Sequence, residues 1–249
     1  MPELVWLIGA STGIGRSLAL RLARDGATVV ASARSADRLQ ELAAEAPAGR
    51  IVPWPVDVTD LAALRAAADG IEAAHGAIAV AVLNAGTHKP VSAAEFTVAG
   101  LRELMELNVF GVANALEVLM PRMIGRRSGQ IAVVASVAGY RGLPTAAYYG
   151  ASKAALINMA ESLKFDLDRA GVKLQLIDPG FVRTPLTDRN EFSMPFLMEP
   201  DAAADRIARG LKGSGFEIAF PRRFVAILKL LRILPYRLYF ALVGRGTGK

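Results

Sequence analysis

Short apolar runs alternate along the chain with longer segments in which apolar residues recur at helical spacing. Leu18, Leu22 and Ala23 form one helical stripe, and Leu61, Leu64 and Ala68 form another. Repetition of strand, helix and strand is typical of a parallel sheet covered by helices. Strands that are apolar throughout are typical of burial on both faces. The pattern predicts an α/β fold, a doubly wound parallel sheet with helices on both faces. Its seven predicted strands are residues 4–9, 27–32, 51–56, 77–83, 130–136, 172–178 and 216–220.

Composition narrows the class of protein. The chain has 249 residues, of which 53% are hydrophobic, and this length suits one α/β domain. We expect a single domain over residues 1–220, followed by a helical extension over 221–249. The chain has no cysteine and only two histidines, so we expect no disulfide and no metal site. The first residues lack the basic start of a signal peptide, and we expect a cytoplasmic protein.

The positive charge of the chain is concentrated at its C-terminal end. No acidic residue follows Glu217, whereas seven basic residues do: Arg222, Arg223, Lys229, Arg232, Arg237, Arg245 and Lys249. The net charge of +6 therefore belongs to this tail. It does not indicate a nucleic-acid-binding fold.

A glycine-rich segment, GASTGIGRS at residues 9–17, follows the first predicted strand and opens a helix. Glycine permits a tight turn and a close approach of the backbone to a pyrophosphate. The free N–H groups at the start of a helix also attract phosphate. A simple βα turn is the alternative, but the placement between strand and helix favours nucleotide binding. The residues concerned are Gly9, Ser11, Thr12, Gly13, Ile14, Gly15 and Arg16.

The end of the second predicted strand indicates which dinucleotide is bound. An acidic residue there would bind the ribose 2′-hydroxyl of NAD, but the strand ends in ASAR without an acid. Arg34, helped by Arg16 and by Ser32 or Ser35, could instead bind a 2′-phosphate. We therefore expect NADP(H) to be preferred over NAD(H).

Two adjacent tyrosines, Tyr148 and Tyr149, raise the question of which one does chemistry. Lys153 lies four residues after Tyr149, on the same helical face, while Tyr148 has only Ser152 at that spacing. A nearby ammonium group lowers the pKa of a phenol, which can then exchange a proton with a carbonyl oxygen or an alcohol. We expect Tyr149 to be the acid/base and Tyr148 to pack or line the pocket. A surface Tyr/Lys pair is the alternative.

Further motifs make the pattern specific. Ser136 ends the fifth predicted strand, NAG at 84–86 follows the fourth, Asn108 lies in ELNVFG, and DPGFVRTP spans 178–185. Together with the glycine segment and Y-x-x-x-K, they resemble the short-chain dehydrogenase/reductase family over about residues 4–220. Two positions depart from the family pattern: Ile8 replaces a threonine and Leu83 replaces an asparagine.

The resemblance implies a Rossmann-type fold and a role for each matching residue. Tyr149 is the implied general acid/base, and Lys153 lowers its pKa and binds the nicotinamide ribose. Ser136 orients the substrate oxygen, and Asn108 holds a water molecule on the proton path. A buried amide bonded to backbone is the alternative for Asn108. The other implied cofactor contacts are Asp57, Val58, Asn84, Ala85, Gly86, Pro179, Gly180, Val182 and Thr184. The resemblance also implies a homodimer or homotetramer packed through helices around 101–121 and 148–169.

The segment from Thr184 to Pro200 is irregular and is predicted to be a loop or lid. Its methionine and aromatic residues suit an adaptable apolar pocket or, equally, a cover for the core. We expect a hydrophobic ketone or alcohol as substrate. The expected pocket residues are Ser136, Tyr140, Leu143, Phe181, Phe192 and Met194, with Arg141 on the rim and His88 and Lys89 on the opposite rim.

The tail after the last strand is apolar and basic, and Pro235 should divide it into two helices. Its cations make it a poor transmembrane span. Residues 221–243 could lie on a membrane surface, cap the pocket or join subunits, and the sequence leaves these open. Two functions also remain: an NADP(H)-dependent oxidoreductase acting on C=O or CH–OH groups, and a non-catalytic NADP-binding sensor or scaffold.

Overall fold

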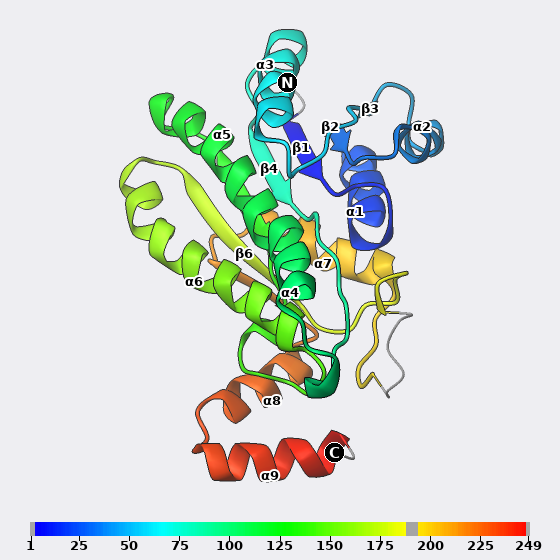
Figure 1. Cartoon of the computed structure of the whole chain (residues 1–249). Helices are drawn as coiled ribbons and strands as arrows, with labels where there is room; N and C mark the ends of the chain where they lie inside the picture. Colours follow the sequence, from blue (N-terminus) through cyan, green and yellow to red (C-terminus); the bar gives the residue numbers. More distant parts are fainter. Residues whose placement is uncertain (1–2, 188–193, 248–249) are drawn as a thin grey trace.

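The computed structural model describes residues 3–187 and 194–247, with side chains described as far as Arg245. Seven parallel strands form one sheet in the order β3-β2-β1-β4-β5-β6-β7, which confirms the predicted sheet (Figure 1). The strands are β1 Leu4–Ile8, β2 Thr28–Ser32, β3 Ile51–Pro53, β4 Val80–Leu83, β5 Gln130–Val134, β6 Lys173–Pro179 and β7 Glu217–Phe220.

Helices cover both faces of the sheet. One face carries α3 (Leu61–His75), α4 (Val98–Met105), α5 (Gly111–Gly125) and α6 (Ala147–Arg169). The other carries α1 (Gly13–Arg24), α2 (Ala36–Glu45) and α7 (Pro200–Lys212). Short helical turns lie at η1 (Ala93–Glu95), η2 (Glu106–Phe110) and η3 (Val137–Gly139), and η2 is a π-helical turn that joins α4 to α5.

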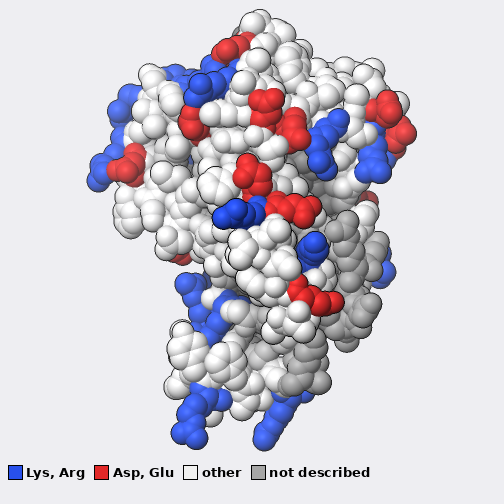
Figure 2. Space-filling view, in the orientation of Figure 1, with Lys and Arg blue, Asp and Glu red and all other residues white. Residues whose placement is uncertain are grey.

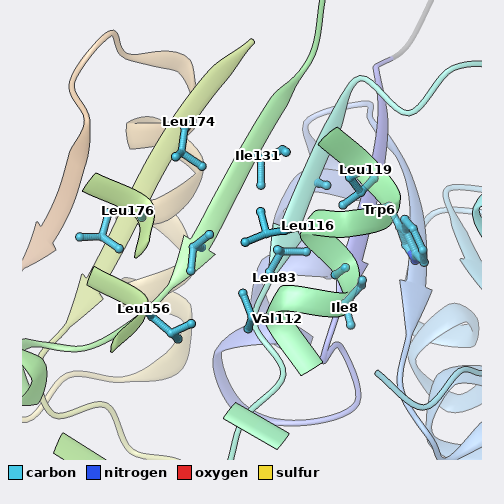
Figure 3. Packing of buried hydrophobic residues seen from close by; sticks show 14 of the residues in the cluster. Trp6, Ile8, Leu83, Val112, Leu116, Leu119, Ile131, Leu156, Leu174 and Leu176 are labelled. Carbon is cyan, nitrogen blue, oxygen red and sulfur yellow. The ribbon is translucent and has the colours of Figure 1, made fainter. Parts of the chain in front are cut away.

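Side chains along each strand alternate between two hydrophobic clusters. In β1, Trp6 and Ile8 face the cluster on the side of α3, α5 and α6, while Val5 and Leu7 face the cluster on the side of α1 and α7. Figure 3 shows Trp6 and Ile8 packed beside Val112, Leu116 and Leu119 of α5. This two-sided burial explains why the strands are apolar throughout.

Local side chains fix where several helices begin. Ser35 caps α2 by accepting from the N–H of Arg38, and Asp60 caps α3 by accepting from the N–H of Ala63. The third strand is shorter than predicted, because it ends at Pro53 and Pro55 follows closely without an N–H to donate.

The tail forms two helices, α8 (Arg222–Arg232) and α9 (Tyr236–Thr247), separated at Pro235 as predicted. They lie together at one end of the molecule, beyond the end of β7 (Figure 1). By length and composition, one helix in the described part of the chain could cross a membrane, Val98–Gly125. Its α5 segment packs against one face of the sheet, where Val112, Leu116 and Leu119 are buried in the hydrophobic core.

Candidate active site

The glycine-rich turn lies at the carboxyl edge of the sheet, at the point where the strand order reverses between β1 and β4. Gly9 has a positive φ of 92°, and a side chain on it would approach the backbone nitrogen of Ala85 to 2.5 Å. A side chain on Gly15 would lie 2.0 Å from the carbonyl oxygen of Gly9. Asn84 ties the turn to the end of β4 by donating to that same oxygen at 2.7 Å. The close packing therefore requires glycine at both positions.

A segment distant in sequence closes this turn from the other side. A side chain added to Gly13 would lie 2.9 Å from the Cγ2 atom of Thr184. Val182 forms a bridge with Met198 and is buried. The structure thus brings the glycine turn, the NAG segment and Thr184 together at the N-terminus of α1. This shallow, side-chain-free cradle beside free N–H groups fits the pyrophosphate of a dinucleotide.

The end of β2 presents Arg34, which is exposed. Asp57 follows β3 and accepts hydrogen bonds from the N–H and the hydroxyl of Thr59. The backbone bond from Thr59 is the main cause that lowers the pKa of Asp57, and the positive charge of Arg34 adds to it. Val58 beside it is buried, and its side chain packs so close to Gly111 that a side chain on Gly111 would collide with it.

Two expectations for the 2′-phosphate site need correction. The hydroxyl of Ser32 is buried and accepts from the indole nitrogen of Trp6 at 2.9 Å, so it does not face a ligand. Arg16 forms an ion pair with Glu45, which draws it toward α2. Arg34 is exposed at this corner.

The two adjacent tyrosines have different surroundings. Tyr148 is 1% exposed, and its hydroxyl accepts from the N–H of Thr97 at 2.6 Å and donates to the carbonyl of the same residue at 2.9 Å. Tyr149 is partly exposed, and its ring meets that of His88 edge-on, with centroids 4.7 Å apart. Tyr148 is therefore a packed structural residue, and His88, expected on the opposite rim, lies against the ring of Tyr149.

Ser136, Tyr149 and Lys153 converge at the carboxyl end of β5. Ser136 donates to the carbonyl of Pro179 at 3.3 Å and accepts from the N–H of Ala138. The side chain of Ser136 also acts on the neighbouring phenol, because it acts to lower the pKa of Tyr149 against the effect of burial. Lys153 is buried and donates to the carbonyl of Val134 at 2.9 Å, with its nitrogen 5.6 Å from the Tyr149 ring centroid.

The acidity of Tyr149 differs from the expectation drawn from the sequence. Burial raises the pKa of Tyr149; the bond to Ser136 opposes this increase, and the charge of Asp178 adds to it. Burial also lowers the pKa of Lys153 to about 8, against the opposing effect of Asp178. Lys153 points at a backbone carbonyl, so Ser136 rather than Lys153 counteracts the desolvation of the phenol.

Asn108 lies in the π-helical turn between α4 and α5 and is fully buried. Its side-chain oxygen accepts from the N–H of Thr87 at 2.7 Å, and its amide donates to the carbonyl of Thr87 at 2.9 Å and to the hydroxyl of Ser152 at 3.1 Å. The side chain is thus bonded to backbone, which was the alternative weighed for it. It joins the loop after β4 to α6, which carries Tyr149. Gly86 lies beside it, where an added side chain would be 3.3 Å from Asn108 and 3.6 Å from Lys153.

A buried acidic pair lies behind Lys153, and the sequence motifs did not single it out. Both carboxylate oxygens of Asp178 are buried, and no hydrogen-bond donor among the described residues reaches them. The carboxylate of Glu217 lies beside them. Burial and the charge of Glu217 raise the pKa of Asp178 to about 7. The only signal in the sequence was a charged residue at the end of an apolar strand.

Tyr140 belongs to this acidic pair and not to the substrate rim, where the sequence analysis placed it. It is buried, its hydroxyl donates to Glu217 at 2.5 Å, and it lines a cavity of about 160 Å³ with Asp178, Glu217 and Lys229. Burial, followed by the charge of Asp178, raises the pKa of Tyr140. The expected pocket role of Tyr140 is therefore wrong.

A larger open cavity of about 560 Å³ adjoins the start of α6. Of the expected pocket residues, Leu143 lines it. Phe181 instead packs against Phe224 of α8, with ring centroids 5.4 Å apart, and Phe224 also meets Phe196. Met194 is partly buried, and Phe192 lies outside the described residues. The residues that line the cavity are Val91, Ser92, Ala93, Phe96, Leu143, Pro144, Thr145 and Ala147.

The sequence over residues 3–193 matches the family described as short chain dehydrogenase. An uncharacterized oxidoreductase of Myxococcus xanthus is 38% identical over 239 residues, which cover 95% of this chain and 94% of the relative. A 3-oxoacyl-[acyl-carrier-protein] reductase of Thermotoga maritima is 31% identical over 222 residues, 88% of each chain. The chain therefore belongs to the short-chain dehydrogenase family, a family of oxidoreductases.

Solved structures agree with this assignment over nearly the whole fold. A short-chain dehydrogenase of Burkholderia cenocepacia in complex with NADP has a TM-score of 0.83 and 26% identity, and the match covers 97% of both chains. A short-chain dehydrogenase/reductase of Burkholderia phymatum in complex with NAD has a TM-score of 0.84 and 25% identity, over 92% of both chains.

Proposed function

We propose that this protein is an NADP(H)-dependent reductase or dehydrogenase that interconverts a carbonyl group and a secondary alcohol on a hydrophobic small molecule. The observation that carries the proposal is the convergence of Ser136, Tyr149 and Lys153 beside the glycine cradle, at one edge of the sheet. Relatives that are named as reductases, or that were solved with NADP or NAD, support it.

Tyr149 is the group that exchanges a proton with the substrate oxygen in this proposal. When bound, the nicotinamide supplies a hydride to the carbonyl carbon, and the phenol donates its proton to the oxygen, so that the product is a neutral alcohol. Ser136, whose side chain already acts to lower the pKa of Tyr149 against the effect of burial, would hold the same substrate oxygen beside the phenol. The phenolate left on Tyr149 is reprotonated from solvent, and oxidation of an alcohol follows the reverse order.

Lys153 would bind the ribose and hold positive charge beside the phenol. Its nitrogen lies beside Gly86, where an added side chain would come within 3.6 Å of it, so glycine leaves room next to the ammonium group, which supports this role. Its lowered pKa, about 8, means that a bound anion or a phenolate would favour its charged form. Asn108 would act as a positioning residue, because its bonds to Thr87 and Ser152 hold the loop after β4 against α6.

The preference for NADP(H) rests on Arg34. It is exposed at the end of β2, and the sequence has no acid there to bind a ribose 2′-hydroxyl. Arg34→Asp should weaken NADPH binding at least tenfold and leave NADH binding equal or tighter. Titration of protein fluorescence with each nucleotide measures this. An equal loss of NADPH binding and NADH binding would show that Arg34 does not bind the 2′-phosphate.

The apolar lining of the 560 Å³ cavity supports a hydrophobic substrate. Leu143 and Pro144, a few residues before Tyr149 along the chain, form an apolar wall together with Phe96. Ser92 and Thr145 supply two hydroxyl groups. A cyclic or lipid-like ketone fits this lining better than a sugar.

The test is NADPH consumption over a panel of apolar ketones and aldehydes, with Tyr149→Phe measured alongside. Turnover should fall at least a thousandfold in the variant, because the proton donor is gone, while NADPH binding stays within threefold. Tyr236→Phe, which removes a hydroxyl from an exposed ring in the tail, is the matched control and should keep full turnover. Equal turnover in wild type and Tyr149→Phe would contradict the role of Tyr149. Tight NADPH binding without turnover on any compound would favour the sensor alternative.

A further inference from the structure

The two tail helices lie at the edge of the sheet that carries the candidate active site. α8 starts directly after β7, whose carboxyl end lies beside Gly180 through a 2.7 Å bond from the Gly180 N–H to Phe220. α9 crosses below α8 at the end of the molecule (Figure 1). The tail therefore projects from the same edge as Ser136 and Tyr149.

Part of this helix pair is packed against the molecule, but many of its other side chains are apolar and exposed. Phe224, Val225 and Leu228 of α8 and Tyr239 of α9 are buried. Seven large apolar or aromatic residues of the tail are between 47% and 77% exposed: Ile227, Leu230, Ile233, Tyr236, Leu238, Phe240 and Leu242. So many neighbouring exposed apolar side chains are typical of an interaction surface.

Cations surround this apolar surface without any acid. The seven basic residues after Glu217 meet no acidic residue in the tail. Lys229 forms an ion pair with Glu217, while Arg222, Arg223, Arg232, Arg237 and Arg245 are exposed. Figure 2 shows only basic and uncharged residues on the visible face of the tail, with acidic residues confined to the body above it.

Basic residues around exposed apolar side chains match a bilayer surface with anionic lipids. Apolar side chains enter the boundary between headgroups and acyl chains, and each Lys or Arg near an anionic surface contributes about 1 kcal/mol. At 11 and 12 residues, α8 and α9 are too short to span a bilayer, which takes about 20 residues. We propose that α8 and α9 dock this protein on an anionic phospholipid membrane surface.

The same contacts that hold the tail would place the cavity near the lipid. Arg141 donates to the carbonyls of Leu231, Arg232 and Leu234 at 2.7–3.0 Å. Arg141 is followed closely in sequence by Leu143, Pro144 and Thr145, which line the 560 Å³ cavity. A docked tail therefore brings this wall of the cavity toward the bilayer, where a carbonyl compound dissolved in lipid could enter. Docking itself is independent of the proposed reaction, whereas delivery of a lipid-phase substrate rests on it.

The experiment is flotation of the full-length protein with vesicles of phosphatidylcholine alone or with 30% phosphatidylglycerol, at 50 and 500 mM NaCl. The protein should float with the anionic vesicles at low salt, and binding should fall at least tenfold with phosphatidylcholine alone. Arg223→Glu combined with Arg237→Glu should abolish binding, and so should Leu230→Ser combined with Phe240→Ser. Matched controls are Arg24→Glu at the end of α1 and Ile124→Ser at the end of α5, which are also exposed and should bind like wild type.

NADPH binding, measured without vesicles, confirms that each variant is folded. Absence of wild-type binding to anionic vesicles, or unchanged binding of both double variants, would overturn the proposal. A smaller oligomer in the Leu230/Phe240 variant, with no vesicle binding by wild type, would identify the surface as a contact between copies and also overturn it. Failure of the proposed reaction would look different: vesicle binding would persist while no ketone is reduced.

Discussion

Asp178 shows how strongly one residue can depend on its surroundings. Its pKa is raised to about 7 because it is buried and because Glu217 lies beside it. The other titratable or charged groups around it are Tyr140, Tyr149, Lys153, Glu161, Lys229 and Arg232. In the unfolded chain the carboxyl group has its ordinary pKa near 3.8. The folded state therefore binds this proton more tightly, and ionisation of Asp178 costs stability.

This difference predicts a pH dependence of stability. The contribution of Asp178 should lower the free energy of unfolding as pH rises from about 4 to about 7, by up to about 1.4 kcal/mol per pH unit. Burial acts to raise the pKa of Glu217, but Lys229 and Tyr140 hold it below the usual 4.5, so Glu217 acts in the opposite direction only below about pH 4.5. Asp178→Asn should thus lose less stability than wild type between pH 5 and pH 8. Urea denaturation at both values measures this, with exposed Asp166→Asn as control. An identical pH dependence in Asp178→Asn and wild type would refute the prediction.

The two adjacent tyrosines differ in ways that helical spacing predicts only in part. Spacing to Lys153 distinguished Tyr149 from Tyr148, because helical geometry places residues four apart on one face. Spacing could not show that Tyr148 bonds to Thr97, which lies 51 residues away. It also could not show that burial, not Lys153, dominates the pKa of Tyr149. Desolvation depends on what surrounds a group, and only the folded chain determines that.

At the scale of elements, Arg141 links the loop after β5 to the C-terminus of α8. Its guanidinium group donates to three carbonyls there and lies 4.0 Å from the ring centroid of Tyr239 and 4.7 Å from that of Tyr236. A cation at a helix C-terminus is favoured by the helix dipole, and its position over two rings adds a cation–π contribution. Arg141 was expected on the rim of the pocket, and its bonds show that it also anchors the tail.

Arg141→Ala should therefore loosen the tail. We expect a loss of about 1–3 kcal/mol in stability, since three carbonyl bonds and two ring contacts disappear. Hydrogen exchange should accelerate in residues 231–245 while β1, β4 and β5 keep their protection. Arg24→Ala in α1 is the control. Unchanged exchange in the tail would show that Tyr239 and the buried face of α8 suffice to hold it.

The positions of the strands and helices were predicted closely from the sequence, because apolar runs and helically spaced apolar residues indicate which side chains are buried. The π-helical turn at Glu106–Phe110 was not predicted. Its sequence has ordinary helical spacing, and no local signal distinguishes a π turn from an α turn. The π turn directs Asn108 toward Thr87 and Ser152, with which it forms hydrogen bonds. These partners are distant in sequence, so local helix propensity does not reveal the turn.

At the scale of the whole molecule, two aromatic residues lie exposed on the helices expected to join subunits. Phe165 of α6 is 72% exposed and Phe110, between α4 and α5, is 56% exposed. We propose that these helices form a contact between two copies of the chain, in a homodimer or in a homotetramer. This surface lies on different elements from the tail.

Phe110→Glu combined with Phe165→Glu should reduce the molar mass in solution at least twofold, because charges would be forced into an apolar contact. Light scattering after size exclusion measures the mass. Leu230→Ser combined with Phe240→Ser is the control, and it should leave the mass unchanged if the tail serves lipid rather than subunits. A monomeric wild-type protein, or a dissociated control, would contradict this arrangement.

The sequence by itself determined the parallel sheet, the glycine cradle and the set Ser136, Tyr149 and Lys153. These features depend on local periodicity, on the lack of a side chain and on short spacings, which are all visible along the chain. Only the tertiary structure decided that Ser32 is bonded to Trp6, that Tyr140 belongs to a buried acidic pair, and that the tail projects from the active-site edge. Each of these depends on residues far apart in sequence that meet only when the sheet closes, and burial then sets their charge and bonding.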